Sequence, residues 1–447
     1  MRLVTEVFLA RVSPLTNKKS TSAGFRFSRR VNLSIDQPIS FLMAYAVGNP
    51  DLISLAAGLV DYQSLPIEET GKLVGELLAE PRAGQVALQY GTTRGLRELR
   101  EVLLEHMARL DGLEPQDLGA DPDHVVVTSG SQQLLFIITD VLVDPGDIVI
   151  TEWPSYFVYL AALKSFGAEV RAVEIDEQGM VPEQLERLLS ELQASGDLHR
   201  VKILYTSDYH QNPTGITLSA DRRPKILDIV RCYSRDHRIL ILEDAAYREL
   251  TYDGQGPASI RSHDPDNQHV VLAQTFSKPF SPGLRTGYGL LPGDLVEPVL
   301  SQKGNHDFGS ANFLQHLLLA AMTKGVYDQH VDQLRRTYAA KCDAMLEALQ
   351  HHLGRYAGDQ MRWTIPSGGM YVYLSLPLNI DTGRQGTLFQ RALDRHVLYV
   401  PGEFCYGPDP TRTVPRHHIR LSFGEVTIEQ IGEGIARLAE GIREVMG

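Results

Sequence analysis

Short apolar segments alternate with amphipathic segments between residues 120 and 290, and this alternation limits the possible folds more than any other feature of the sequence. The apolar segments read HVVVTSG, DIVITEW, AEVRAVEI, KILYTS, ILILED, HVVLAQTF and TGYGLL. Strands this apolar are typical of a mainly parallel sheet, because the helices that connect parallel strands cover both of its faces. We therefore predict an α/β fold with its functional loops at the carboxyl ends of the strands.

The length of the chain predicts two structural units, because its 447 residues exceed an average domain. After residue 311 the sequence indicates one or two long helices and then the strand-like MYVYLSL and HHIRLSFG, which favours a second, smaller α+β domain. The predicted organisation is a flexible N-terminal arm (1–30), the N-terminal part of the small domain (31–60), the large domain (61–325) and the C-terminal part of the small domain (326–447).

The composition favours a cytoplasmic protein that acts on small molecules. The formal net charge is -12, from 55 acidic and 43 basic residues, which argues against binding to nucleic acid or to an anionic membrane. No run reaches the roughly 20 apolar residues of a membrane helix, and Arg11 interrupts the apolar N-terminus, so no signal peptide is predicted. The three cysteines form no CxxC pair, so neither a disulfide framework nor a metal site is expected.

A turn of small residues follows the first apolar strand. In TSGSQQ, the residues Ser129, Gly130, Ser131 and Gln132 stand between that strand and a predicted helix. Free backbone N–H groups at a helix N-terminus, next to a glycine without a side chain, form a cradle for an anion such as phosphate. The alternative is an ordinary turn in which a serine caps the helix.

Polar residues follow two later strands. Asn212 lies in QNPTG, where the proline and the glycine fix a turn that can hold the amide of Asn212 towards a ligand. Asp244 ends ILILED, three residues before Tyr247, and a carboxylate at that depth needs a cationic partner. The alternatives are a plain turn for QNPTG and a helix cap for Asp244.

A single lysine follows the strand HVVLAQTF. In TFSKPFSPGLR, Pro279 keeps Lys278 out of helical geometry, and the SPG turn brings Arg285 back towards the strand end. A buried lysine has a lowered pKa, and its neutral amine can form a Schiff base. The alternative is a lysine exposed on a loop.

Taken together, these motifs resemble those of the fold-type I pyridoxal-phosphate enzymes of aminotransferase class I and II, most closely the 2-aminoadipate aminotransferase-like subgroup. The resemblance runs from about residue 50 to the C-terminus. It rests on the order of QYGTTRGLRELR, TSGSQQ, EWPSYFVY, QNPTG, EDAAYREL, TFSKPFSPGLRTGY, PSGGMYVYL, VPGEF and IRLSFG. Each motif is weak alone, whereas the ordered set is specific.

The resemblance implies a pyridoxal 5'-phosphate cofactor and gives each candidate residue a role. Lys278 matches the lysine that forms the Schiff base and moves the proton between substrate and cofactor. Asp244 matches the carboxylate that keeps the pyridine nitrogen protonated. The other implied cofactor contacts are to the ring oxygen from Asn212 and Tyr247, to the ring face from Tyr156, and to the phosphate from Ser129, Gly130, Ser131, Gln132, Thr275 and Arg285.

The resemblance also implies a substrate clamp and a homodimer. Arg420, in HHIRLSF, matches the arginine that binds the substrate α-carboxylate, because a planar guanidinium suits bidentate binding. Asn212 and Gly58 match residues close to that carboxylate. Tyr90 matches a tyrosine that reaches the phosphate of the neighbouring subunit, which implies active sites shared between subunits. The implied activity moves an amino group between an L-amino acid and a 2-oxo acid.

Two departures from the 2-aminoadipate pattern concern the substrate. Ser40 stands where acid-selective members have an arginine, which speaks against a long diacid. Asp208 and His210 lie in the SDYH segment directly before QNPTG, and the segment GNHDFGSAN carries His306 and Asp307. We therefore hypothesise that the enzyme recognises a polar or cationic substrate side chain. The alternative is that these groups make hydrogen bonds within their loops.

Other functions share part of this pattern. A lyase, a β- or γ-replacement enzyme, an oxidase or a carbon-carbon bond-forming enzyme would use the same cofactor residues, so those residues do not separate these enzymes from a transaminase. A regulator with a winged helix ahead of an aminotransferase-like domain is disfavoured, because the residues before the resemblance show no helix-turn-helix pattern and the net charge is acidic.

Overall fold

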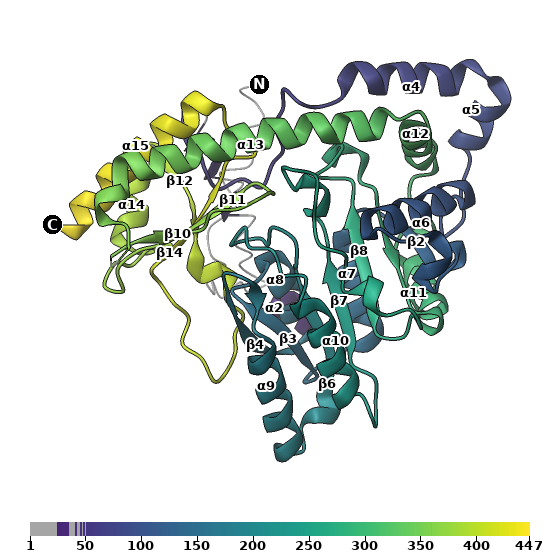
Figure 1. Cartoon of the computed structure of the whole chain (residues 1–447), viewed down its shortest axis with the longest axis horizontal. Coiled ribbons are helices and arrows are strands. Elements are labelled where there is room, and N and C mark those ends of the chain that lie inside the picture. Colours follow the sequence, from purple (N-terminus) through teal and green to yellow (C-terminus); the bar gives the residue numbers. More distant parts are fainter. Residues whose placement is uncertain (1–24, 35–40, 43–44, 47, 50, 359) are drawn as a thin grey trace.

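The computed structural model describes residues 25–34, 41–42, 45–46, 48–49, 51–358 and 360–447, and an eight-stranded sheet lies at the centre of this described part (Figure 1). The strand order is β2-β9-β8-β7-β6-β3-β4-β5. The strands are β2 (Val125–Thr128), β3 (Ile148–Trp153), β4 (Glu169–Asp176), β5 (Gly179–Met180), β6 (Val201–Thr206), β7 (Leu240–Asp244), β8 (Val270–Thr275) and β9 (Gly287–Leu290).

The middle of this sheet is parallel and its margins are antiparallel. The middle five strands pair with one another in parallel, in the order β8, β7, β6, β3 and β4. Strand β9 runs antiparallel to both β2 and β8, and β5 runs antiparallel to β4. The predicted α/β fold with a mainly parallel sheet is confirmed. The antiparallel direction of β9 could not be predicted from TGYGLL. This strand is fully buried, so its residues are as apolar as those of the parallel strands.

Helices cover both faces of the large sheet. One face packs against α7 (Ser131–Leu142), α8 (Phe157–Phe166) and α11 (Gly293–Asp307), and the other against α9 (Pro182–Ser195) and α10 (Arg222–Tyr233). This covering explains why the strands are apolar along their whole length.

Strand β7 shows how the two faces differ in what they carry. Leu242 packs in the cluster of α7 and α8, whereas Ile241 packs in the cluster of α9 and α10. Because successive side chains on a strand point to opposite faces, Asp244 faces α7 and α8, and Glu243 faces α9 and α10.

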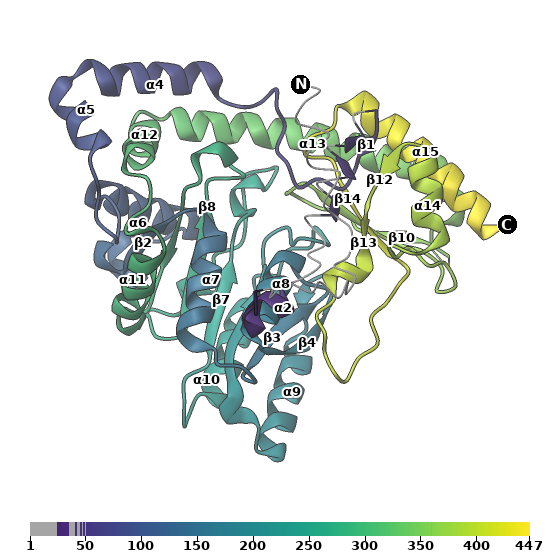
Figure 2. The ribbon, with the colours of Figure 1, turned by 180° about the vertical axis from the view of Figure 1, so that it is seen from behind.

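A smaller, four-stranded sheet is built from the C-terminal segment alone. Its order is β10-β11-β14-β13, from β10 (Arg362–Trp363), β11 (Tyr371–Ser375), β14 (His418–Ser422) and β13 (Val400–Pro401). Next to it, β1 (Ile53–Ser54) pairs in parallel with β12 (Val397–Leu398). The long helix α13 (Val326–Leu353) runs from the large sheet's side to α14 (Thr387–Asp394) and α15 (Ile428–Met446), as Figures 1 and 2 show.

The remaining helices are α2 (Arg29–Leu33), α4 (Ile67–Ala79), α5 (Pro81–Leu88), α6 (Arg97–Asp111) and α12 (Asn312–Thr323). Residues 1–24 and Ser40 lie outside the described residues. At the end of the predicted arm, α2 begins: the Ser28 hydroxyl accepts a hydrogen bond from the Val31 N–H, and Arg30 bonds to Asp140 of α7.

The described residues contain no helix with the length and apolarity needed to cross a bilayer. They also contain no group of three or more histidine, cysteine, aspartate and glutamate side chains placed to hold a metal ion.

Candidate active site

Lys278 lies directly after β8, in the segment that turns back to β9. Its Nζ donates a hydrogen bond to the Gly58 carbonyl at 2.6 Å. Burial lowers the pKa of the Lys278 amine; the nearby Tyr371 opposes this shift, whereas the guanidinium groups of Arg420 and Arg285 add to it. Lys278 is therefore a partly buried amine with a weakened hold on its proton, and not a fully solvated loop charge.

Asp244, at the end of β7, is 4% exposed. Its oxygens accept hydrogen bonds from the Tyr205 hydroxyl at 2.9 Å and from the Ala246 N–H at 3.3 Å. Burial raises the pKa of Asp244 to about 6, the two hydrogen bonds lower it, and the charge of Asp208 raises it. No lysine or arginine among the described residues forms an ion pair with Asp244, so this carboxylate can receive a cation from a ligand.

This raised pKa leads to a prediction for the cofactor-free protein. Because the native state holds the Asp244 proton more tightly than the unfolded chain, the contribution of Asp244 to stability falls as the pH rises from about 4 to about 6. Relative to wild type, Asp244→Asn is expected to gain roughly 3 kcal/mol of unfolding free energy across this window and to keep the gain at higher pH. Its affinity for the cofactor should fall.

Denaturant unfolding of both cofactor-free proteins at several pH values measures this difference. If the stability difference between the two proteins does not change with pH, the pKa of Asp244 is not raised in the folded protein. That result would contradict the description of Asp244 as a buried carboxyl without a cationic partner.

The N-terminus of α7 forms a cradle of backbone and side-chain donors. Gly130 has φ +79° and precedes the helix, and no side chain caps the first turn. A Cβ atom at Gly130 would lie 3.1 Å from Nη2 of Arg285 and 3.8 Å from Oγ1 of Thr275, so only glycine leaves this space open. Ser131 and Gln132 begin the helix at the same place.

The cradle also holds an arginine without an ion-pair partner and a buried amide oxygen without a hydrogen-bond partner among the described residues. Arg285 contacts the oxygens of Ser277 at 3.2 Å and Ser129 at 3.5 Å, and it makes no ion pair with any described carboxylate. The side-chain oxygen of Gln132 is buried without a hydrogen-bond partner in the described structure. A guanidinium whose charge no described carboxylate pairs with, beside an uncapped helix N-terminus, matches a phosphate.

Arg420 projects from β14 and is 2% exposed. Its Nη1 donates to Oδ1 of Asn212 at 2.8 Å, its Nη2 donates to the Ala56 carbonyl, and its guanidinium lies 4.4 Å from the centre of the Tyr371 ring. Its Nε is buried without a partner in the described part of the chain. No carboxylate of the described chain neutralises this arginine, so a carboxylate from a substrate can do so.

Two tyrosines that were not predicted complete the site. Tyr371, at the start of β11, hydrogen-bonds the Tyr247 hydroxyl at 2.9 Å, and a Cβ atom at Gly58 would lie 2.8 Å from the Tyr371 hydroxyl. Tyr205, on β6, donates to Asp244. The Lys278 amine lies 5.8 Å from the centre of the Tyr247 ring, so Tyr247 and Tyr371 border the amine.

Of the remaining predicted residues, Tyr156 lies among the charged groups of the site and Tyr90 lies apart from them. Tyr156 immediately precedes α8 after the strand β3, and burial raises the pKa of its phenol. Tyr90 is 84% exposed and packs edge-on against Phe308 at 5.8 Å. Tyr90 therefore presents its ring to the outside of the chain.

Asp208 and His210 are not available to a substrate, which corrects the hypothesis that they read its side chain. Asp208 is 1% exposed, and its carboxylate accepts a hydrogen bond from the buried Arg223. The ring nitrogens of His210 are engaged by the hydroxyls of Thr251 at 2.9 Å and Thr217 at 3.0 Å. Burial lowers the pKa of His210 to about 3, so its ring is neutral at ordinary pH.

His306 and Asp307, the other two residues hypothesised to recognise the substrate side chain, also have partners within the chain. Asp307 forms an ion pair with Lys303 at 2.9 Å and accepts a hydrogen bond from the Gln133 amide at 2.9 Å. The His306 ring lies 5.8 Å from the Phe136 ring. These contacts support the alternative in which the groups make bonds within their own part of the chain.

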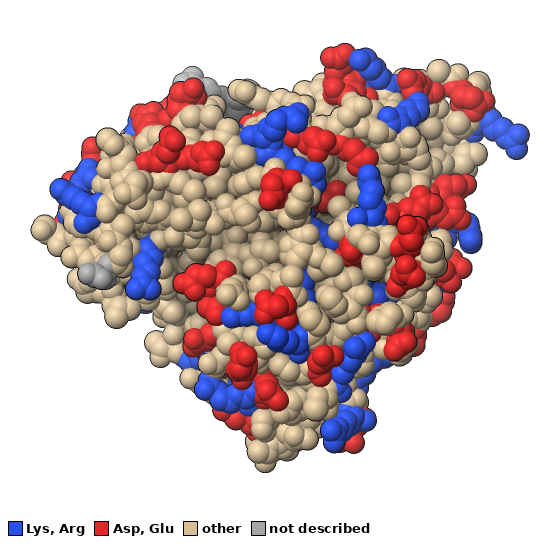
Figure 3. Space-filling view, viewed as in Figure 1, with Lys and Arg blue, Asp and Glu red and all other residues tan. Residues whose placement is uncertain are grey.

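A cleft of about 990 Å³ opens between β4 and the small sheet, and it includes none of the predicted site residues. Its walls carry Trp153, Trp363, Tyr373, Tyr406 and His418. Figure 3 shows a hollow of uncharged residues near the middle of the face viewed there, with charged side chains scattered around it. The candidate catalytic residues described above therefore surround the Lys278 amine and do not line this open cleft.

The residues that the structure brings together fit pyridoxal phosphate. The cradle of Gly130 and Arg285 matches the phosphate, and the buried Asp244 without a cationic partner matches a protonated ring nitrogen. The lysine with a lowered pKa matches the cofactor's aldehyde. Together with the sheet topology, this arrangement defines a fold-type I pyridoxal-phosphate enzyme.

Comparisons with known proteins specify the class further. The family model of aminotransferase class I and II matches residues 50–438. The aromatic-amino-acid aminotransferase 1 of Thermococcus litoralis is 36% identical over 400 residues, which cover 90% of each chain. The 2-aminoadipate transaminase of Thermus thermophilus is 30% identical over 402 residues, covering 89% of this chain and 91% of that protein.

A solved structure gives the same result. The kynurenine aminotransferase of Pyrococcus horikoshii, in complex with PMP, matches with a TM-score of 0.84 and 33% identity over 94% of this chain and 98% of that one. The chain belongs to the class I and II aminotransferases. It is a pyridoxal-phosphate-dependent enzyme that transfers an amino group from an amino acid to a 2-oxo acid.

Proposed function

We propose that Lys278, Asp244, Tyr247, Asn212 and Arg420 carry this amino-group transfer in the roles that the resemblance implies. The observation that carries the proposal is the buried Arg420, which contacts Asn212 and has an unpartnered Nε. Its Nη2 donates to the Ala56 carbonyl, two residues before the Gly58 carbonyl that accepts from Lys278. A carboxylate clamp and a proton-accepting amine are thus bonded to the same short segment.

The cofactor, when bound, supplies an electron sink that makes a proton on the α-carbon of the amino acid removable, and it carries the amino group between the two substrates. Lys278 accepts that proton at Nζ and returns it, a role that its lowered pKa favours. Arg420 and Asn212 bind the α-carboxylate and so place the α-carbon within reach of the amine. Asp244 would accept a hydrogen bond from the protonated ring nitrogen and so keep that nitrogen charged.

The remaining predicted residues would hold the cofactor in place. Ser129, Gly130, Ser131, Gln132, Thr275 and Arg285 surround the phosphate cradle. Tyr156 offers its ring to the cofactor's face, and Tyr247 offers its hydroxyl to the ring oxygen. The Tyr371 hydroxyl, bonded to that of Tyr247, fixes the direction in which the Tyr247 hydroxyl points.

We also propose that the preferred amino donor has an aromatic or other uncharged side chain. The described residues near the clamp include the rings of Tyr371 and Phe157, which lie 4.4 Å and 5.4 Å from the Arg420 guanidinium. Asp208 and His210 are engaged elsewhere, so neither selects a charged side chain. Names of relatives that include aromatic amino acids and kynurenine support this proposal.

A substrate panel tests the proposed donor. Phenylalanine and tyrosine are expected to give kcat/KM values at least about tenfold above those of glutamate and lysine, because burying a charged side chain without a partner costs more than burying a ring. The matched measurement uses one 2-oxo acid acceptor throughout. A preference for lysine or glutamate would contradict the proposed donor and leave the transfer reaction in place.

We further propose that the enzyme is a homodimer in which Tyr90 reaches the partner's phosphate cradle. Exposed apolar side chains gather on α4, α5 and the segment after α11, namely Ile67, Leu78, Val86, Leu88, Tyr90 and Phe308. A group of large exposed apolar residues is typical of a subunit contact.

We also propose a cytoplasmic location and a division into two domains. The three cysteines are free thiols, which supports the cytoplasmic location. The large and small sheets support the division into domains at residues 60 and 325.

Hybrid dimers test the shared site. Lys278→Ala and Tyr90→Ala are each expected to be weakly active alone, and co-refolding or co-expressing them should restore activity. In a hybrid dimer, one site would carry both substitutions and the other site would carry neither. Size-exclusion chromatography of the same samples reports the oligomeric state. Weakly active single variants that gain no activity on mixing, despite forming dimers, would place Tyr90 outside the partner's site.

A further inference from the structure

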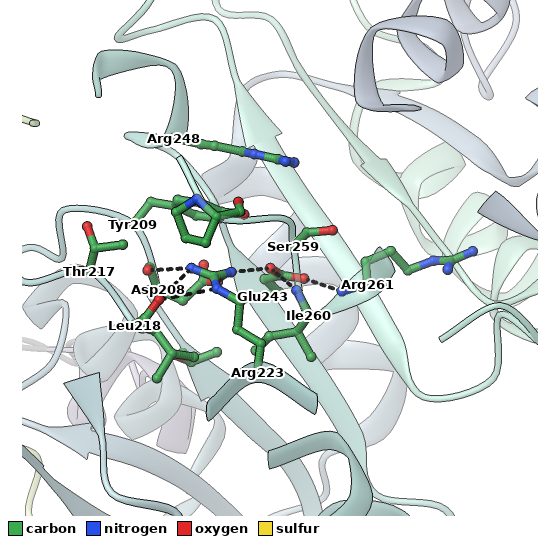
Figure 4. Close-up of polar contacts among 12 residues, drawn as sticks. Asp208, Tyr209, Thr217, Leu218, Arg223, Glu243, Arg248, Ser259, Ile260 and Arg261 are labelled. Carbon is green, nitrogen blue, oxygen red and sulfur yellow. Dashed lines mark hydrogen bonds and ion pairs between the residues drawn. The ribbon is translucent and has the colours of Figure 1, made fainter. Parts of the chain in front are cut away.

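The loop that carries Asn212 and the strand that carries Asp244 meet in a buried ionic cluster. Asp208, Arg223 and Glu243 form this cluster, and none of their side chains has exposed surface. Figure 4 shows Arg223 between Asp208 and Glu243, with Tyr209 stacked over its guanidinium at 4.2 Å. We call these three residues the Arg223 clasp.

Arg223 closes the base of the loop 208–218. Its Nη2 donates to the carbonyls of Asp208 at 3.0 Å and Leu218 at 3.1 Å, and its Nε donates to the Leu218 carbonyl at 3.2 Å. The Leu218 N–H donates to the Asp208 carbonyl at 2.9 Å. Asn212 lies within this closed loop, so the position of its amide depends on where the base is held.

The same guanidinium reaches the strand β7. Its Nη1 lies 3.4 Å from Oε1 of Glu243, the residue directly before Asp244. The two oxygens of Glu243 accept hydrogen bonds from the N–H groups of Ile260 at 2.8 Å and Arg261 at 2.9 Å. Because Glu243 points to the α9 and α10 face, the clasp holds the strand from the face opposite to the one that Asp244 occupies.

Stability alone does not account for such a cluster. Two buried carboxylates share one guanidinium, and Oδ1 of Asp208 has no hydrogen-bond partner in the described structure. Replacing buried ion pairs by apolar side chains of similar volume is often neutral or stabilising, because removing charges from water is costly. A buried pair of this kind does fix direction and distance, since each hydrogen bond tolerates little displacement.

We infer that the Arg223 clasp is a positioning device, which sets the Asn212 amide and the Asp244 carboxylate at a fixed separation on the other side of the sheet. The inference rests on the roles proposed for Asn212 and Asp244. Arg223, Asp208 and Glu243 are positioning residues, because each acts on the substrate and the cofactor only through those two side chains. Loosening the clasp weakens cofactor and substrate binding together.

Arg223→Met, Arg223→Lys and the control Arg222→Met test the clasp. Arg222 directly precedes Arg223 in the same helix and forms a more exposed ion pair with Asp176 at 2.6 Å; its guanidinium also donates to the carbonyls of Gly179 and Met180, outside the loop 208–218 and β7. Arg223→Met is expected to raise both the cofactor dissociation constant and the KM for the amino acid by roughly tenfold or more, since misplacement of about 1 Å can cost up to 100-fold. Arg223→Lys, which keeps the charge, should restore part of each loss.

The readouts separate positioning from general destabilisation. Arg222→Met is expected to lower the melting temperature while leaving the cofactor dissociation constant and KM unchanged. The clasp is contradicted if Arg223→Met lowers only the melting temperature, or if Arg222→Met shifts the two constants equally. Should Arg223→Met fail to fold, Asp208→Asn, which preserves volume, is expected to raise the same two constants, and unchanged constants would overturn the inference.

Failure of the clasp differs from failure of the proposed function. If Arg420→Met and Asp244→Asn lose substrate and cofactor binding as predicted while the clasp variants keep both, the catalytic roles stand and only the clasp is wrong. If Arg420→Met and Asp244→Asn bind normally, the proposed roles themselves are wrong.

Discussion

Lys278→Ala is expected to abolish the visible absorbance of the cofactor held covalently by the enzyme and to lower kcat by roughly 10⁴-fold or more. The substitution removes both the amine that bonds the cofactor and the group that moves the proton, and each loss alone is large. Absorbance spectra of the purified holoenzyme and steady-state transfer rates measure the two effects. Lys278 sits directly after β8, and its Nζ bonds only a backbone carbonyl, so its loss should disturb little else.

A second lysine serves as the control for this prediction. Lys202 lies on β6 with its amine 3.9 Å from Asp147, away from the contacts of the site. Lys202→Ala should keep the absorbance and the transfer rate. Retention of the cofactor band and of a tenth or more of the activity in Lys278→Ala would remove Lys278 from the reaction.

Arg420→Met is expected to raise KM for the amino acid and for the 2-oxo acid by at least about 30-fold, with a smaller effect on cofactor binding. Truncating one partner of a buried charge pair costs about 2–5 kcal/mol, which corresponds to this change or more. Arg420→Lys should lie between wild type and Arg420→Met, because an ammonium keeps the charge but loses the bidentate geometry. Steady-state kinetics with both substrates give the values.

Arg416→Met is the matched control for the clamp. Arg416 lies just before β14, is half exposed and pairs with Asp381 and Glu403 at the surface. Its replacement should leave both KM values unchanged. A KM that is the same in Arg420→Met and wild type would show that the carboxylate is bound by another group.

The general fold could be predicted from the sequence because the alternation of apolar strands and amphipathic helices reflects burial on both faces of a sheet. The antiparallel direction of β9 could not, since strand direction depends on pairing with β2 and β8 and leaves no mark on an apolar tetrapeptide. Residues 53–54 pair with 397–398, a contact between distant segments that periodicity does not reveal.

The site shows the same limit. Lys278, Asn212 and Asp244 could be predicted because each stands at or after the end of a strand in a recognisable motif. Tyr205 and Tyr371 could not, because a tyrosine within an apolar strand reads like any core residue until its hydroxyl partner is known.

Asp208 and His210 were misjudged because closeness to QNPTG in the sequence does not say where a side chain points. Asp208 lies only four residues before Asn212, yet its carboxylate turns to Arg223 on the α10 side of the sheet. His210 has a φ of 45°, and both of its ring nitrogens have threonine partners. Their partners, and not their order along the chain, determine what they do.

Chemical reduction of the holoenzyme tests most directly whether the Lys278 amine is the centre of the reaction. Borohydride fixes the cofactor to the lysine that holds it, and peptide mapping by mass spectrometry then identifies that lysine. We predict one modified residue per chain, Lys278, and loss of the label when an amino acid donor converts the cofactor to its amine form before reduction. A label on any other lysine, or one that an amino donor fails to remove, would contradict this account.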